Sequence, residues 1–413
     1  MPLTLLKYGL RCSYPSRPFL PDEREAKSTY DVVVIGGGGH GLAIAYYLAQ
    51  DQGIRDVAVI ERGYLGGGNT ARNTAIIRAN YLTPEGVAFY RESMELWRDL
   101  SNVLDINLMY SERGHLTLAH TDAAIRTMRW RAEVNKHLGV ESEFVGLDDL
   151  ATLCPELNLS RSVRFPILAA LYHPTGATAR HDAVAWGYAR AAANRGVHIL
   201  QETEVTGIVR EGGRVIAVET NRGRIGCGRA VQAVAGTSVQ VGAMAGLRLP
   251  IQPYPLQACV SVPVKPVLDP IVVSGSLHVY IWQSQRGELV MGGATDPYPL
   301  HGTRATLDFK ESLTMHILEL FPFLAEARLM RQWAGVTDMT ADFAPIMGLT
   351  PLANYFVDAG WGTWGFKATP VAGKRMAECI ATGRQPDILK PFHLERFRDF
   401  RLLGEKGAAS VGH

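Results

Sequence analysis

The stretch from Tyr30 to Glu61 constrains the fold of this chain more than any other. It begins with a β-branched run, Val32 to Ile35, of the kind found in strands that are buried on both faces of a parallel sheet. Glycines end the run, and apolar residues at helical spacing follow them up to Leu48. A second apolar run then ends at Glu61. This order of strand, glycines, helix and strand predicts a βαβ unit.

The glycines between the first strand and the helix indicate a dinucleotide site. Gly36, Gly38 and Gly41 fit G-x-G-x-x-G, in which the first permits a tight turn, the second admits a pyrophosphate and the third lets helix and strand pack closely. Glu61 follows about twenty residues later, where a carboxylate accepts the ribose hydroxyls of an ADP moiety and argues against a 2′-phosphate. A glycine-rich turn that merely ends a strand is the alternative, and the agreement of all the parts argues against it.

Composition excludes several classes of protein. The 413 residues are enough for two or three domains, and the net charge of +2 gives no reason to expect a nucleic acid partner. The five cysteines are scattered and lack a C-x-x-C pair, so neither a disulfide framework nor a metal site is predicted. No apolar run reaches the length of about 18 residues that a membrane span needs, and no convincing signal peptide precedes the first strand. We therefore expect a cytoplasmic protein without a membrane segment.

The chain is expected to have an α/β fold, α+β overall, in which a Rossmann-like nucleotide-binding domain is joined to a second domain on a mixed, largely antiparallel sheet. Residues 250 to 340 supply much of that sheet, because they alternate like exposed antiparallel strands. The predicted boundaries are an N-terminal arm at 1–29, a discontinuous nucleotide domain at 30–109, 166–249 and 341–390, a substrate domain at 110–165 and 250–340, and a tail at 391–413.

Two further glycine-rich segments are placed to meet a ligand. The segment after Glu61 carries three glycines and then polar groups, and it either wraps a pyrophosphate or forms a plain surface loop; its candidate contacts are the neutral Asn69, Thr70 and Thr74 and the charged Arg72. Near the other end of the chain, Tyr355 to Ala359 reads as a buried strand, and the glycines at 360, 362 and 365 as a loop. A closing helix is predicted from Val371 to Ile380.

Five segments together resemble the glycine/D-amino-acid oxidase-like flavoproteins, and in detail the beta subunits of heterotetrameric sarcosine oxidases. They are GGGGHGLAIAYYLA, GGGNTARNTAIIRANY, ARHDAVAWGYARAAANRGV, QWAGVTDMTADFAPIMG and GWGTWGFKATP, in that order along the chain. The resemblance covers almost everything after residue 29. It implies noncovalent FAD in the nucleotide domain, and a second flavin, FMN, bound covalently at the interface with an alpha subunit. Gamma and delta subunits complete such assemblies, and NAD and tetrahydrofolate are expected on the alpha subunit.

The resemblance also implies site residues. Carried over by motif, the residues that line FAD are Gly39, His40, Gly41, Glu61, Asn69, Thr70, Thr74, Ile76 and Val205. The same transfer gives His181 as the FMN attachment with Arg180 beside it, and it places Gly362, Gly365 and Lys367 near a flavin. FAD is expected to be untethered, because the stretch in which single-chain relatives attach it, Arg331 to Gly348, contains no cysteine.

The FMN attachment has a competitor in the sequence. His173 is also a histidine in a predicted loop near the return to the nucleotide domain. His181 is preferred, because Arg180 and Asp182 match the motif around the attachment, and Asp182 is a candidate to orient a ring nitrogen of the histidine. Without the motif, a histidine before a helix is most simply a capping or packing residue.

Arg78 and Lys367 match the pair that holds the substrate carboxylate in the single-chain relatives. A small amino acid offers few groups to bind, and a guanidinium with an ammonium supplies charge-assisted hydrogen bonds that fix its C–H bond. Two departures from the family pattern stand out. Trp364 replaces a glycine, which narrows the space near a flavin, and the hairpin from Tyr280 to Met291 lacks the lysine that assists oxygen in single-chain oxidases.

The resemblance implies oxidative demethylation of sarcosine. Hydride passes from the N-methyl group to FAD and the electrons pass through FMN to oxygen, so that hydrogen peroxide, glycine and a formaldehyde-level unit for tetrahydrofolate result. No general base is evident in the sequence. One alternative is the beta subunit of a related amine or proline dehydrogenase without covalent FMN. An alternative of another class is a non-catalytic dinucleotide-binding scaffold subunit.

Overall fold

The computed structural model describes residues 7, 9, 10, 19, 20 and 25–405 of the chain. Most of the predicted arm at 1–29, and residues 406–413 of the predicted tail, lie outside these residues. The helices are α2 (Gly39–Gln50), α3 (Pro84–Val103), α4 (Asp122–His137), α5 (Leu147–Leu153), α6 (His181–Ala193), α7 (Ser238–Met244), α8 (Leu307–Leu320) and α9 (Gly365–Thr382). Short 3-10 turns are η1 (Thr70–Arg72), η2 (Ala235–Thr237), η3 (Pro322–Glu326), η4 (Asp387–Phe392) and η5 (Leu394–Phe397).

The strands form two large sheets and a small one. They are β1 (Thr29–Ile35), β2 (Val57–Ile60), β3 (Ile76–Ile77), β4 (Ser111–Glu112), β5 (His115–Ala119), β6 (Glu143–Val145), β7 (Ala169–His173), β8 (Ala177–Thr178), β9 (His198–Leu200), β10 (Val205–Glu211), β11 (Arg214–Thr220), β12 (Gly223–Gln232), β13 (Ile251–Ser261), β14 (Ile271–Ser274), β15 (Val279–Gln283), β16 (Leu289–Thr295), β17 (Leu329–Thr340), β18 (Ile346–Leu349) and β19 (Tyr355–Ala359). The small sheet has the order β3-β8-β4.

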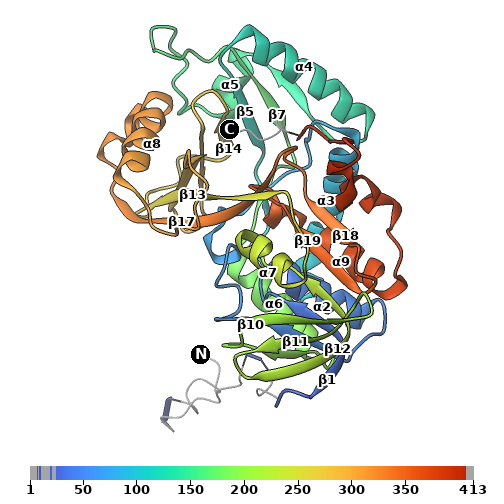
Figure 1. Ribbon diagram of the computed structural model, residues 1–413. Coiled ribbons are helices and arrows are strands. Elements are labelled where there is room, and N and C mark those ends of the chain that lie inside the picture. Colours follow the sequence, from blue (N-terminus) through green and yellow to red (C-terminus); the bar gives the residue numbers. More distant parts are fainter. Residues whose placement is uncertain (1–6, 8, 11–18, 21–24, 406–413) are drawn as a thin grey trace.

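The first large sheet is built around β1, in the lower part of Figure 1. Its order is β10-β11-β12-β1-β2-β9, with β19 and β18 continuing beside the carboxyl half of β12. The pairs that β1 makes with β2 and β12 are parallel, as are β2 with β9 and β12 with β19. Val32 and Val34 pack toward α2, α6 and α9, whereas Val33 and Ile35 pack on the opposite face. The predicted βαβ unit and the α/β fold class are therefore confirmed.

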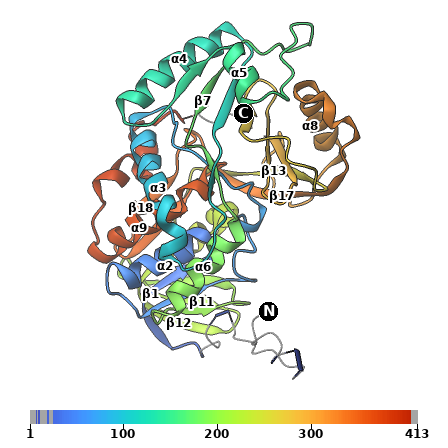
Figure 2. The ribbon, with the colours of Figure 1, turned by 180° about the vertical axis from the view of Figure 1, so that it is seen from behind.

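The second large sheet fills the upper part of Figure 1, with α8 to one side (Figure 2 shows the reverse). Its order is β17-β13-β16-β15-β14-β5-β7-β6, and every pair is antiparallel except β14 with β5. The alternation in residues 250–340 does not mean exposure, since β15 is buried at all its positions. Val279 and Ile281 pack on the α8 side of the sheet, whereas Tyr280 and Trp282 pack against Ala75 on the other side.

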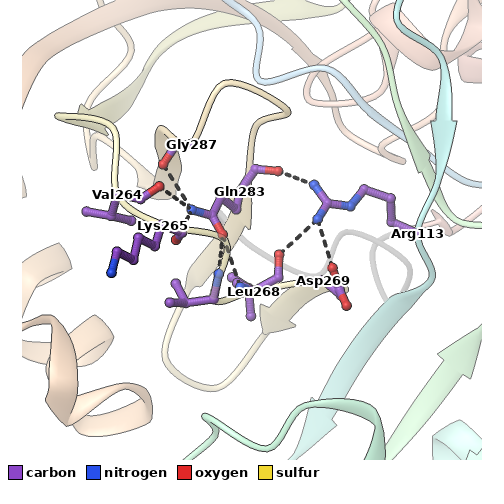
Figure 3. Close-up of polar contacts among 8 residues, drawn as sticks. Arg113, Val264, Lys265, Leu268, Asp269, Gln283 and Gly287 are labelled. Atoms are coloured by element: carbon purple, nitrogen blue, oxygen red, sulfur yellow. Dashed lines mark hydrogen bonds and ion pairs between the residues drawn. The ribbon is translucent and has the colours of Figure 1, made fainter.

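Gln283, the last residue of β15, holds together the loops at that end of the strand (Figure 3). Its buried amide accepts from the N–H groups of Val267 and Leu268, at 2.8 and 3.1 Å, and donates to the carbonyls of three neighbouring residues, Val264, Lys265 and Gly287. Arg113 donates to the Gln283 carbonyl from the other side and pairs with Asp269 at 3.3 Å. The polar groups of the loop before β14 are thereby paired. Lys265 takes part through its backbone and has an exposed side chain.

The closing helix begins earlier than predicted. The sequence pattern places its start at Val371, after Pro370, but α9 starts at Gly365, so Gly365 and Lys367 lie in its first turn rather than in a loop. A proline inside a helix removes one N–H donor and leaves carbonyls in the preceding turn without their usual partner. Here the carbonyl of Lys367 accepts from Ser93 Oγ at 2.5 Å and from Trp97 Nε1 at 2.9 Å. These bonds tie the first turn of α9 to α3 beside the Phe366 carbonyl, the group that lacks a helical donor because Pro370 has no N–H.

Every described helix is too short or too polar to cross a bilayer. No group of three or more His, Cys, Asp or Glu side chains among the described residues is arranged to hold a metal ion.

Candidate active site

The first glycine segment joins β1 to α2 at the carboxyl edge of the first sheet. Gly36 has a φ of 113°, which favours glycine, and its N–H donates to the Ile60 carbonyl at 2.8 Å. A Cβ on Gly41 would overlap the Gly36 carbonyl, so Gly41 permits the close packing of helix on strand. Gly38 is the N-cap of α2 and provides no side-chain cap. The N-terminal turn of α2, with its favourable dipole, is therefore available to an anion.

Glu61 ends β2 beside these glycines. Its carboxylate accepts from the N–H groups of Gly37, at 2.8 Å, and Gly63, at 2.9 Å, which fixes the side chain at the edge of the turn. A carboxylate has capacity for further hydrogen bonds beyond these two, so Glu61 can still accept from ribose hydroxyls.

A cavity of about 800 Å³ opens at this edge and continues to the second sheet. Its lining includes residues of β13, β15 and β17 as well as the glycine segments. Fifteen of the predicted residues line it: Gly36, Gly38, Gly39, His40, Glu61, Asn69, Thr70, Arg72, Thr74, Ile76, Arg78, Val205, Gly362, Gly365 and Lys367. Gly41, Arg180 and His181 do not. A second hollow of about 1230 Å³, between β13, β17 and η5, contains none of the predicted residues.

The second glycine segment closes over the first. Thr70 Oγ1 accepts from the Gly39 N–H at 2.9 Å, and the Asn69 amide exchanges two hydrogen bonds with the Val336 backbone in β17. Arg72 behaves differently from the predicted charge partner, because its Nη1 donates to the carbonyls of Gly67 and Gly68. Its guanidinium thus fastens its own loop while it lines the cavity.

His40 connects the first glycine segment to the start of α9. Its Nδ1 lies 2.8 Å from Asp358 Oδ2, and its Nε2 lies 2.7 Å from the Gly365 carbonyl. Both partners have acceptor oxygens, so the arrangement suits the protonated ring, in which both nitrogens donate. Burial acts to lower the pKa of His40, but Asp358, Gly365 and the more distant Asp338 raise it, and the net shift is upward.

Two buried basic side chains, Arg78 and Lys367, also line the cavity. Arg78, 5% exposed, donates from Nη1 to the Asn80 carbonyl at 3.1 Å and to Asn80 Oδ1 at 2.9 Å, and its guanidinium lies over the Tyr81 ring at 4.6 Å. Lys367, 7% exposed, donates to the Thr363 carbonyl at 3.4 Å. Burial, and then the charge of Arg78, lower the pKa of Lys367 well below its ordinary value. An anion bound between the two would relieve this repulsion.

Two more side chains line the cavity near Arg78 and Lys367. One of them, His115, was not predicted from the sequence, and the other, Trp364, was named there as a departure from the family pattern. His115, the first residue of β5, lines the cavity and was missed; burial and the cations Arg78, Arg131 and Lys367, together with His173, lower its pKa well below the usual value, so it is neutral. A polar residue opening the buried strand HLTLA was the available signal. Trp364 also lines the cavity, with its ring edge-on to Tyr81 at 5.0 Å.

The structure separates the two candidate histidines. His173 is 1% exposed, its Nδ1 donates to the Glu141 carbonyl at 2.6 Å, and its Nε2 accepts from the Ala79 N–H at 3.3 Å. Both its nitrogens are therefore occupied. His181 begins α6, outside the cavity, and its Nδ1 is buried without a hydrogen-bond partner.

The predicted role of Asp182 as the group that orients His181 is not what the structure shows. Its two carboxylate oxygens accept from Arg180, each at 2.8 Å, and one of them also accepts from the Ala183 N–H. A guanidinium matches both oxygens of a carboxylate at once, which a ring nitrogen cannot do.

Comparison with known proteins identifies the family. A family model described as FAD dependent oxidoreductase matches residues 31–379. The chain belongs to this FAD-dependent oxidoreductase family. It is 45% identical over 400 residues to sarcosine oxidase subunit beta of Arthrobacter sp, covering 97% of this chain and 99% of that relative. The protein of the same name from Rhodobacter capsulatus is 46% identical over 389 residues, covering 94% of each chain.

Solved structures agree with the family assignment. The crystal structure of L-proline dehydrogenase from P. horikoshii has a TM-score of 0.86 to this chain at 28% identity, and the match covers 91% of this chain and all of that one. The FAD of the family also fits the residues present. Open first-turn N–H groups suit a pyrophosphate, Glu61 suits a ribose, and the cavity extends from them to the buried cations.

Proposed function

We propose that this chain is the FAD-binding subunit of a sarcosine oxidase built from several subunits. The relatives named sarcosine oxidase subunit beta share 45–46% of their residues with it over nearly their whole length. One structural observation carries the proposal. Arg78 and Lys367 are buried together at the end of a cavity that starts at the glycine segments, which is the arrangement needed to hold a small carboxylate beside a flavin.

The chain's own residues would bind and orient the substrate. Arg78 and Lys367 would bind the carboxylate, and their positive charge favours the deprotonated form of the nearby amine. Trp364, which lines the cavity, would exclude water and hold the N-methyl group in place, and Tyr81 packs against its indole ring. FAD, when bound, supplies the acceptor for a hydride from that N-methyl group. The iminium left behind adds water, or reacts with tetrahydrofolate on an alpha subunit, to give glycine and a formaldehyde-level unit. No described residue is assigned as a general base.

The residues proposed to hold FAD come from several separate segments of the chain, and all of them except Gly41 line the cavity. They are Gly36, Gly38, Gly39, His40 and Gly41 of the first glycine segment, Glu61, the group Asn69, Thr70, Arg72, Thr74 and Ile76, then Val205, and Gly362, Gly365 and Lys367 near α9. Gly41 acts through packing rather than contact, and Arg72 acts by closing its loop.

The finer part of the proposal concerns His181, which would carry a covalently attached FMN from which oxygen receives electrons to form hydrogen peroxide. Its unpartnered Nδ1 and the fully bonded ring of His173 favour His181 as the attachment. Arg180 would lie beside the group, which we expect at an interface with an alpha subunit that also binds NAD. Gamma and delta subunits would complete the assembly.

Intact mass of the denatured chain tests the attachment. We expect an FMN-sized increment that disappears in His181→Ala and persists in His173→Ala. An increment that His181→Ala retains would contradict the assignment, and a bare chain from the assembled enzyme would remove covalent FMN altogether.

A second candidate function follows from the structural match to L-proline dehydrogenase. The cyclic side chain of proline needs more room at the α-carbon than sarcosine does, and Trp364 occupies space at that end of the cavity. Sarcosine is therefore the better fit.

Anaerobic reduction of the bound flavin separates these functions. In the assembled enzyme, sarcosine is expected to bleach the flavin absorbance and L-proline to leave it unchanged. Arg78→Lys should raise the sarcosine concentration needed, whereas the matched control Arg286→Lys, at a side chain 76% exposed, should not. Bleaching by proline alone would favour the second candidate, and bleaching by neither would favour a scaffold role.

A further inference from the structure

The segment Asn80–Thr83 determines where Arg78 lies. It connects Arg78 to α3, and both polar contacts of Arg78 Nη1 described above are to Asn80 within it. Tyr81, the next residue, supplies the ring beneath the guanidinium. These contacts couple the position of the guanidinium to that of the segment.

Two buried residues of α4 hold the first half of this segment. Arg131, 3% exposed, donates from Nη2 to the Asn80 carbonyl, and Asn135, fully buried, donates to the Tyr81 carbonyl at 3.0 Å. One turn of helix separates the two, so they present donors to successive carbonyls of the segment. Helix α4 belongs to the upper part of the molecule, far from the glycine motif (Figure 1).

Glu405 holds the second half from the far end of the described chain. Its carboxylate is 1% exposed and accepts from the backbone N–H groups of Leu82, at 3.3 Å, and Thr83, at 3.0 Å, and from the Thr83 hydroxyl. These groups lie at the N-terminus of α3, where the helix dipole favours a negative charge. Gly86 leaves the room, because a Cβ there would overlap the carboxylate.

The charges of these groups depend on one another. Burial and the neighbouring Arg78 lower the pKa of Arg131 to about 9, and Glu405 acts in the opposite direction. Without the carboxylate, two buried guanidinium groups would face each other with less compensation, which is costly at low dielectric. Glu405 thus offsets the repulsion that would otherwise push Arg131 and Arg78 apart.

We propose that Glu405 and Arg131 are positioning residues that fix Arg78 for the substrate carboxylate by holding Asn80–Thr83 from both sides. The inference rests on the proposed role of Arg78 and goes beyond it. The substrate site would thus depend on residues 36 to 41, 78 to 83, 131 and 405. Neither Arg131 nor Glu405 lines the cavity, so both would act through the segment Asn80–Thr83.

The test uses Glu405→Gln in the full-length assembled enzyme. The amide keeps the size of the side chain and loses its charge. Acetate serves as a probe of the carboxylate site, and its Kd is read from the change in flavin absorbance. We expect the Kd of acetate and the KM of sarcosine to rise about tenfold, with FAD content unchanged. The control is Glu395→Gln, which removes an exposed carboxylate paired with Arg398 at 3.0 Å and should change neither constant.

Arg131→Lys provides a second variant that keeps the charge and shortens the fork, and we expect a rise in the acetate Kd there too. Unchanged acetate binding in both variants would overturn the proposal, as would a loss of FAD in parallel with any loss of acetate binding.

A double-mutant cycle distinguishes this inference from the proposed function. If Glu405 acts through Arg78, Glu405→Gln should weaken acetate binding far less in an Arg78→Lys background than in the wild type. If Glu405→Gln weakens acetate binding in the Arg78→Lys background as much as in the wild type, Glu405 does not act through Arg78. Arg78 would then remain the residue that binds the carboxylate. If Arg78→Lys alone leaves the acetate Kd unchanged, the proposed carboxylate site itself is wrong.

Discussion

The buried position of Lys367 beside Arg78 should make its pKa depend on whether an anion is bound. Lys367 is buried, and Arg78 is the charge that affects it most. A carboxylate that binds between them would raise the pKa of Lys367 toward its ordinary value, so binding takes up a proton wherever the free lysine is already neutral. Affinity is then full below the lowered pKa of the free enzyme and falls as pH rises above it.

This predicts a pH-dependent affinity for acetate. The acetate Kd of the assembled enzyme should increase with pH from the lowered pKa of Lys367 upward. Lys367→Met should bind acetate more weakly and with a flat pH profile over the same range, because the titrating group is gone. A sloping profile in the variant would assign the effect to another residue.

Trp364 carries a prediction about substrate size. Its ring lies at the substrate end of the cavity against Tyr81, which itself stacks on Tyr90 at 3.8 Å. Trp364→Gly should raise the kcat/KM for N-methylalanine relative to sarcosine by about tenfold or more, the discrimination expected from one methyl group in a packed site. The cavity should also cost about 3 kcal/mol of stability, measurable by urea unfolding. An unchanged substrate ratio would show that the indole does not limit the site.

Among single residues, site residues that lie in sequence motifs could be predicted, whereas those brought to the site only by the fold could not. Gly36 and Glu61 are recognisable from the spacing of the first glycine motif, and Arg78 and Lys367 from the resemblance of their segments to the family's motifs. His115 and Glu405 lie in no such motif, and their place at or near the site depends on how the second sheet and the last described residues pack.

Among the elements, α2 and α9 are joined by a contact that titrates. His40 at the start of α2 bonds Asp358 at the end of β19 and the Gly365 carbonyl at the start of α9. Its pKa is raised in the fold, so the contribution of this contact is full below the unfolded pKa and is lost as pH rises through the folded one. Asp338 in β17, whose own pKa burial raises to about 6, adds negative charge nearby above that pH.

We therefore predict that FAD retention weakens as the pH rises through the raised pKa of His40. The FAD content after dialysis, or the FAD concentration that half-restores it, should change above the raised pKa of His40. His40→Asn should lose FAD more readily at neutral pH and show little further change on alkalinisation. Equal pH dependence in wild type and variant would exclude His40 as the cause.

The elements near the end of the described chain depend on one buried ion pair. Arg396 in η5, fully buried, donates to both oxygens of Asp342 at 2.8 and 3.0 Å. Arg396→Met leaves that carboxylate unpaired and should destabilise the protein by about 3–5 kcal/mol in urea unfolding. Arg398→Met, at a neighbouring exposed arginine, is the matched control and should cost little. A similar loss in both variants would mean that packing, rather than pairing, holds η5.

The error over the start of α9 has a local cause. Proline disfavours the helical conformation of the residue before it, so a helix that begins five residues earlier is not what Pro370 predicts. Ser93 and Trp97, which donate to the Lys367 carbonyl in the first turn of α9, lie on α3, some 270 residues away in the sequence. Only the packing of α3 on α9 shows why the helix continues.

At the scale of the whole molecule, the cavity lies between two sheets. The strand order of the first could be predicted from the sequence, and that of the second could not. The parallel order around β1 follows from the βαβ pattern, whereas the parallel pairing of β14 with β5 inside an antiparallel sheet does not. Long-range register depends on which faces are buried, and the second sheet is buried on both faces at β15.

Because FAD would contact both sheets, its binding should stabilise the molecule as one unit. Added FAD should raise the melting temperature of the deflavinated protein, by a free energy of about 2.7 kcal/mol at 100 times the Kd. Gly36→Ala, whose Cβ would meet the Ala233 carbonyl, should abolish this response. Two separate transitions, of which FAD shifts only one, would show that the sheets melt independently.

The placement of Glu405 has a consequence for synthesis of the chain. During translation the nucleotide motif leaves the ribosome hundreds of residues before the carboxylate that steadies Arg78, so cofactor capture can precede amino acid recognition. Because every residue that lines the cavity precedes Glu405 in the chain, a polypeptide that ends just short of Glu405 should bind FAD yet hold its amino acid poorly.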